Sequence, residues 1–148
     1  MSVIVGVSVV GVRIPLSRRR IADVTRAVFR SERVGNAFVS VAFVTNPAIR
    51  AINKRHLKRD RATDVIAFSY RAAAGRRPPS SVRVCDIYIA PQVARRNAQA
   101  LGVSIREEIV RLVVHGSLHA LGYDHPETDA RTRSPMWRKQ ERLVRRLA

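Results

Sequence analysis

Residues 104–125, SIREEIVRLVVHGSLHALGYDH, decide the fold and contain the strongest candidate site of this 148-residue chain. Ser104 and Glu107 have the spacing of a capping box, in which each residue binds a backbone N–H of the other. Gly122 suits the position just past a helix end, because glycine adopts the left-handed conformation needed there. The stretch therefore predicts a helix that begins after Ser104 and ends before Gly122. Its apolar face carries Ile105, Ile109, Leu112, Val113 and Gly116.

Three of the four histidines lie within this stretch, at positions 115, 119 and 125. His115 and His119 are four residues apart, so both leave the same face of the predicted helix about one turn apart. Gly122 lets the chain turn, and His125 can then return toward the pair. Three neutral imidazoles with a fourth position left to water are typical of a catalytic zinc site. We therefore expect one Zn²⁺ per chain, bound by His115, His119 and His125, where the metal would activate its bound water as a nucleophile, polarise the scissile bond, or do both.

The general base of this site is a separate question. In zinc peptidases with the motif H-E-x-x-H the base is the glutamate after the first histidine, but Gly116 occupies that position here. Asp124 and Glu127 are the nearest carboxylates, and Asp124 is the candidate catalytic residue. Either carboxylate could instead orient a histidine ring or be an ordinary surface charge.

The rest of the chain predicts alternating strands and helices. Runs rich in Val and Ile predict strands over residues 1–10, 37–44, 65–68 and 82–89. Capping residues and prolines predict helices from residue 17 to before 35, from 46, from 91 to 102 and from 134. Asn46 is the expected N-cap of the second helix, and residues 71–81 are the expected loop. This order predicts an α+β fold in one domain, residues 1–148, with a small mixed β-sheet packed with about five α-helices.

Composition excludes several other classes of protein. A chain of this length buries enough surface to fold without disulfides. Its single cysteine, Cys85, excludes an intramolecular disulfide and a Cys-rich zinc finger, and we expect it to be a small buried hydrophobe. The seven glycines form neither a G-x-G-x-x-G motif nor a Walker loop, so the usual signatures of dinucleotide and P-loop chemistry are missing from the sequence.

The charge indicates a polyanionic partner. The chain carries 28 Lys and Arg against 11 Asp and Glu, a formal net charge of +17. A GC-rich genome could explain a preference for arginine, but not the scarcity of carboxylates. Nucleic acid is favoured over an anionic membrane, because no long basic amphipathic helix stands apart from the globular pattern. The apolar residues 1–10 are too short to span a bilayer and lack the basic residues that precede a secretory signal, so we expect a cytoplasmic protein with no membrane partner.

Four segments of the sequence resemble one known family. HGSLHALGYDH (residues 115–125) is similar to the H-G-x-L-H-L-x-G-Y-D-H signature of the YbeY family of metal-dependent endoribonucleases. DRATDVIAF (60–68) resembles the family's D-x-P-T-D-V-L-S-F segment, and CDIYIA (85–90) resembles its G-D-I-x-I-S strand. Met136-Trp137 with Gln140-Glu141 fits its terminal helix. The resemblance covers the chain from about Asn46 onward.

The resemblance implies a function as well as a ligand set. It implies zinc on His115, His119 and His125, and a single-strand-specific endoribonuclease that acts in ribosomal RNA maturation and ribosome quality control. Its implied partners are RNA, specifically small-subunit ribosomal RNA, and ribosomal proteins.

The sequence departs from the family at the residue thought to face the substrate. Where the family has an arginine after an aromatic residue, this chain has Leu57 after His56. Lys58, Arg59 and Arg61 are the candidate substrate-binding residues, since a cation near the metal would stabilise charge on a phosphoryl oxygen. The alternative for each is a solvated loop charge.

Three functions therefore remain open. The first is the zinc-dependent endoribonuclease. The second is a zinc metallohydrolase acting on peptide bonds, although Gly116 and the net charge of +17 disfavour it. The third is a non-catalytic RNA or ribosome assembly factor with a structural zinc, which the leucine at position 57 favours.

Overall fold

The computed structural model of the chain describes residues 2–70, 82–126 and 128–148. The described part contains four strands, β1 (Val3–Val9), β2 (Ala37–Phe43), β3 (Val65–Tyr70) and β4 (Arg83–Ile89). Its α-helices are α1 (Arg18–Ser31), α2 (Asn46–Leu57), α3 (Pro91–Leu101), α4 (Ile105–Ala120) and α5 (Pro135–Leu147). A short 3-10 helix, η2 (Asp129–Arg133), which the sequence did not predict, precedes α5.

The strands form one mixed sheet in the order β1-β2-β4-β3. β1, β2 and β4 are parallel, and β3 is antiparallel to β4 at the edge. The predicted α+β fold with a mixed sheet and about five helices is confirmed. The expected loop, residues 71–81, lies outside the described residues. The single-domain boundary stays a prediction.

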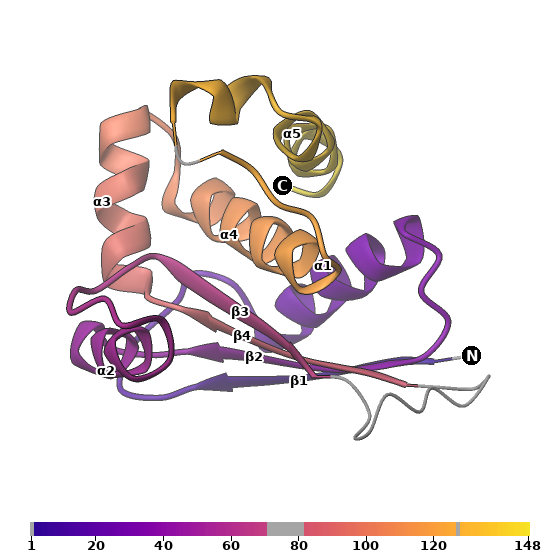
Figure 1. Cartoon of the computed structure of the whole chain (residues 1–148), viewed down its shortest axis with the longest axis horizontal. Coiled ribbons are helices and arrows are strands. Elements are labelled where there is room, and N and C mark those ends of the chain that lie inside the picture. The colour runs from indigo at the N-terminus through magenta and orange to yellow at the C-terminus, as the bar shows by residue number, and fades with distance from the viewer. Residues whose placement is uncertain (1, 71–81, 127) are drawn as a thin grey trace.

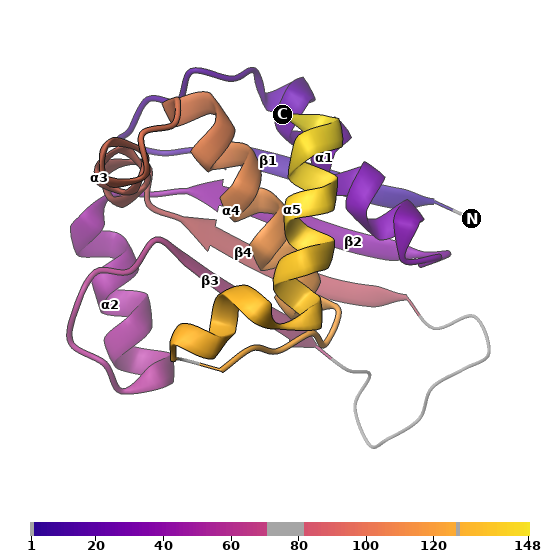
Figure 2. The ribbon, with the colours of Figure 1, turned by 90° about the horizontal axis from the view of Figure 1, so that it is seen from above.

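One face of the sheet is buried beneath two helices. Alternate residues of β2 and β4 point to this face, which α1 and α4 cover side by side, with α5 packed on the outer side of α4 (Figure 1). Cys85 is fully buried in this core, as expected from the sequence. A smaller second core forms where Ile49 of α2 packs with Ile66 of β3 and Ala90. In the view from above, α1 and α2 lie at opposite sides of the molecule (Figure 2).

The helix starts agree with the sequence except at α2. Ser17, Ser104 and Ser134 each accept a hydrogen bond from a backbone N–H in the first turn of the following helix. The prediction that Asn46 caps α2 was wrong by one residue. Thr45 is the N-cap, because its backbone is extended and its hydroxyl accepts from the Ala48 N–H at 3.3 Å. Asn46 is instead the first helical residue, and its N–H donates to Oε1 of Gln92.

Within the described residues, no helix combines the length and hydropathy that crossing a bilayer requires.

Gly116 allows α4 to approach the sheet closely. A Cβ at this position would lie 2.7 Å from Cγ2 of Ile87 and 3.0 Å from Cγ2 of Val65. Both neighbours are β-branched and stiff at χ1, so they have little freedom to move aside. Glycine at position 116 is therefore required by packing between α4 and strands β3 and β4.

We predict that Gly116→Ala lowers the free energy of unfolding. The overpacking penalty, about 1–3 kcal/mol, should outweigh the roughly 1 kcal/mol by which alanine favours a helix over glycine. Urea denaturation measures the difference. Gly6→Ala is the matched control, because no atom lies within 4 Å of a Cβ at that position. Equal stability of the Gly116→Ala protein and wild type would contradict the packing argument.

Candidate metal centre

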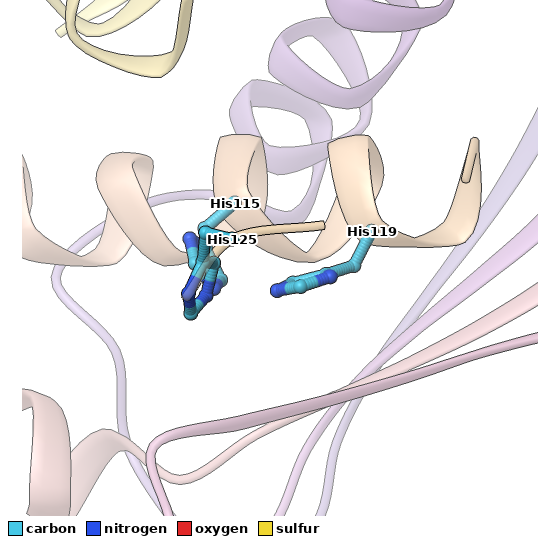
Figure 3. A group of neighbouring side chains, drawn as sticks. All are labelled: His115, His119 and His125. Carbon is cyan, nitrogen blue, oxygen red and sulfur yellow. The ribbon is translucent and has the colours of Figure 1, made fainter. Parts of the chain in front are cut away.

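The structure brings together the three histidines that the sequence singled out. One ring nitrogen of each residue lies within 4.8 Å of the others, so one ion could contact all three. Ring centroids are 4.6 Å apart for His115 and His119, and 5.1 and 4.9 Å from these to His125. Figure 3 shows the imidazoles of α4 and of the following segment projecting into the same space. The assignment of these residues as metal ligands remains a prediction that this geometry fits.

A tight reversal after α4 returns His125 to the helix. Gly122 has a φ of +101°, and its N–H donates to the His119 carbonyl at 2.9 Å. The Tyr123 N–H donates to the Leu118 carbonyl at 3.0 Å. These two bonds form a Schellman motif, which glycine permits because it adopts positive φ without steric cost. The predicted role of Gly122 at the helix end is confirmed.

Hydrogen bonds orient two of the rings. Nδ1 of His115 lies 2.6 Å from Oε1 of Gln140, and Nδ1 of His125 lies 3.0 Å from the carbonyl oxygen of Pro126. In both contacts the oxygen can only accept, so Nδ1 carries the proton and Nε2 keeps its lone pair. Asp124 holds the backbone of His125 rather than its ring, since Oδ1 of Asp124 accepts from the backbone N–H of His125 at 2.8 Å.

The environment keeps the imidazoles of α4 neutral. Burial lowers the pKa of His115 to about 4, against a smaller opposing effect of its contact with Gln140. Burial also lowers the pKa of His119, and the neighbouring His125 adds to the effect. A neutral imidazole has a lone pair for a cation, so these donors suit a divalent transition metal.

The three histidines open onto a cleft of about 1160 Å³. Of the candidate substrate-binding residues, Arg59 and Arg61 line the cleft, whereas Lys58 is not among its described lining residues. Lys58 instead caps the end of α2, with a φ of 56°. Leu57 and Asp124 also line the cleft. Glu127, the other carboxylate considered as a base, lies outside the described residues.

Sequence reasoning missed a polar cluster on the cleft wall. Nδ2 of Asn97 donates to Oδ2 of Asp64 at 3.0 Å and to Oε2 of Glu108 at 3.4 Å. Burial raises the pKa of Glu108, although hydrogen bonding to Arg111 opposes the rise. One signal was available in the sequence. Glu108 precedes His115 by seven residues, so both lie on one face of α4.

Residues 12–148 match the family model described as Endoribonuclease YbeY. The chain belongs to the YbeY family. The resemblance identified from the sequence motifs is therefore confirmed, and it extends farther toward the N-terminus than those motifs do.

Relatives in this family cover most of the chain. Endoribonuclease YbeY of Sulfurihydrogenibium sp. (strain YO3AOP1) is 32% identical over 133 residues, which are 89% of this chain and 84% of the relative. Endoribonuclease YbeY of Thermobifida fusca (strain YX) is 35% identical over 120 residues, which are 78% of this chain and 77% of the relative. The solution structure of TM1509 from Thermotoga maritima has a TM-score of 0.61 at 23% identity, covering 97% of this chain and 89% of that one. This last likeness supports the fold alone.

We predict that His115→Ala and His119→Ala each remove the bound metal. Loss of one of three protein ligands should lower the metal content from about one ion per chain to near zero. Elemental analysis by mass spectrometry after dialysis measures the content and identifies the ion. His56→Ala is the matched control, because His56 lies on α2 with its ring against Phe68, outside the cluster. Full metal retention in both α4 variants would contradict the ligand assignment.

Proposed function

We propose that this chain is a zinc-dependent endoribonuclease that cleaves single-stranded RNA in ribosomal RNA maturation and ribosome quality control. The observation that carries the proposal is the convergence of His115, His119 and His125 on the cleft, in a chain of the YbeY family. Small-subunit ribosomal RNA and ribosomal proteins are the proposed partners, and the cytoplasm is the proposed location.

The donor set supports zinc, one ion per chain. Three imidazoles from α4 and its following turn would hold the ion, and three protein ligands are typical of catalytic zinc sites, whereas structural sites have four. When bound, zinc supplies Lewis acidity and lowers the pKa of a water molecule. A set of three ligands beside a cleft therefore favours an enzyme over an assembly factor with a purely structural zinc.

Arg59 and Arg61 are the proposed phosphate-binding residues. Leu57 is 48% exposed at the cleft and has no group that binds a phosphate, so the contact of the family arginine must come from elsewhere. Asn53, which is buried, fixes the backbone of both candidates. Its carbonyl accepts from the Arg59 N–H at 3.3 Å, and its Nδ2 donates to the Arg61 carbonyl at 3.0 Å. Asn53 thus holds the backbone of both arginines in place.

The same cleft offers a surface for an unpaired base. Trp137 lines the cleft together with Arg131, whose guanidinium carbon lies 5.7 Å from the indole centroid. Aromatic rings and guanidinium planes both stack on nucleobases without selecting a sequence. This pair supports single-stranded RNA as the substrate, because the bases of a duplex are not accessible for stacking.

Asp124 is the proposed proton acceptor. Its Oδ1 is engaged by the His125 N–H, and the carboxylate lies at the cleft, so Oδ2 is the oxygen that would take a proton. The peptidase alternative is disfavoured by Gly116. A side chain at that position would meet Ile87 and Val65, so a glutamate base cannot be accommodated there without repacking the sheet.

We predict that only the metal-loaded wild type cleaves a labelled single-stranded ribosomal RNA fragment. Chelator-treated protein and His119→Ala, prepared in parallel, should cleave at least about 100-fold more slowly, because the metal supplies several kcal/mol of transition-state stabilisation. Parallel preparation controls for contaminating nuclease. If all three proteins bind RNA and none cleaves it, the enzyme assignment is wrong and the assembly factor is right. Cleavage of casein but not RNA would support the peptidase.

We predict that RNA affinity falls steeply with salt and that Arg59 and Arg61 contribute to the dependence. Each phosphate contact to single-stranded RNA adds about 0.7 to the slope of log affinity against log salt. The double variant Arg59→Gln/Arg61→Gln should therefore lower the slope by about 1.4. Arg18→Gln/Arg19→Gln is the matched control, because it also removes two exposed charges but lies on α1, away from the cleft. Equal slopes for the two double variants would contradict the assignment.

A further inference from the structure

We propose that Glu141 and Arg111 act through Gln140 as positioning residues that preset which nitrogen of His115 binds the metal. The four side chains form one chain of polar contacts, which we call the Arg111–His115 relay. It links α4 to α5 and ends at the metal centre. The proposal rests on the metal binding proposed above, but its tests do not depend on RNA cleavage.

Every contact of the relay has the geometry of a hydrogen bond. Arg111 donates to Glu141 at two points, from Nε to Oε2 and from Nη2 to Oε1, both at 3.0 Å. Nε2 of Gln140 donates to Oε2 of Glu141 at 3.0 Å. Oε1 of Gln140 then lies 2.6 Å from Nδ1 of His115. Oε2 of Glu141 therefore accepts from both Arg111 and Gln140.

Glu141 determines which group donates and which accepts in each hydrogen bond of the relay. An ionised carboxylate can only accept, so the Gln140 amide must turn its NH₂ group toward Glu141. The amide oxygen then faces His115 and requires a proton on Nδ1 of that ring. Nε2 of His115 is left with its lone pair in the cleft. One carboxylate thus selects the imidazole tautomer two hydrogen bonds away.

The surroundings keep the relay in this arrangement. Burial opposes ionisation of Glu141, but hydrogen bonds from Arg111 and Gln140 outweigh it and hold the pKa of Glu141 below its ordinary value. Gln140 is only 1% exposed, so water offers its amide few other partners. Arg111 is held in turn by Glu107 and Glu108, at 3.1 and 3.2 Å. These two ion pairs therefore hold the guanidinium in the position from which it donates to Glu141.

The first test follows the His115 ring in the full-length chain with and without zinc, by nitrogen-15 NMR. Wild type should have the proton on Nδ1 in both states. Gln140→Met, which removes the acceptor, should give mixed tautomers before zinc is added. Gln140→Glu, which restores an acceptor, should return the proton to Nδ1. A Gln140→Met protein that keeps a single Nδ1–H tautomer would overturn the proposal.

The second test measures zinc affinity by competition with a chelator. Glu141→Gln should weaken zinc binding about 10- to 100-fold, the range typical of partners that orient a metal ligand. An amide at 141 can accept at only one of these two positions, so in either orientation its NH₂ group faces a donor of Arg111 and one bond of the relay is lost. Glu107→Gln is the matched control, since it also removes one negative charge and one bond to Arg111 but does not touch Gln140.

The two variants separate positioning from general electrostatics. If the relay positions His115, Glu107→Gln should change zinc affinity by less than about 3-fold, while Glu141→Gln shows the full loss. Equal losses in both variants would overturn the proposal, because they would show that only the summed charge near Arg111 matters. Unchanged zinc affinity in Glu141→Gln would likewise overturn the proposal, whereas a wild type that binds zinc but does not cleave RNA would contradict only the proposed nuclease function.

Discussion

The contact between Gly116 and the sheet is the constraint on which the rest of this structure depends. Without a side chain at position 116, α4 rests directly on Ile87 and Val65. This contact sets how deep the helix sits, and His115 and His119 lie on the same helix immediately beside it. The depth of α4 therefore also sets the distance between the imidazoles and the opposite wall of the cleft, which β3 and the segment before it provide. The close packing at position 116 therefore also determines where the candidate ligands lie.

Charged residues of both signs line the cleft at the candidate metal centre. The protein carries a formal net charge of +17, yet three of its 11 carboxylates gather around Arg111 on α4 and α5. Arg59 and Arg61 line the same cleft as Glu108 and Arg111, but they come from the segment that follows α2. Glu141 orients the candidate ligand His115 through Gln140, while burial keeps the imidazoles of α4 neutral, as a cation requires. Arg59 and Arg61 favour a substrate that carries phosphate groups.

Features that depend on residues close together in the chain were predicted from the sequence, whereas side-chain contacts between distant residues were missed. The helical face of α4, the serine caps and the turn at Gly122 follow from residues within a few positions of one another, so their signals are periodic or motif-like. The contact of His115 with Gln140 joins residues 25 positions apart, and Asp64 meets Asn97 across 33 positions. Such pairs become neighbours only when the helices and strands pack. The one wrong cap, Asn46 for Thr45, shows that a neighbouring hydroxyl in an extended backbone can take the role instead.

The reversal at Gly122 has a thermodynamic consequence for the candidate site. Two candidate ligands belong to a helix that the core holds in place, whereas the third belongs to the segment after the helix, which is held by backbone bonds at the helix end, by Oδ1 of Asp124 and by the bond of Lys139 to Tyr123. An ion bound at the candidate site would therefore also stabilise residues 122–126 against their conformational entropy. Substitutions in that segment can raise or lower metal affinity while leaving the imidazoles of α4 and the core unchanged.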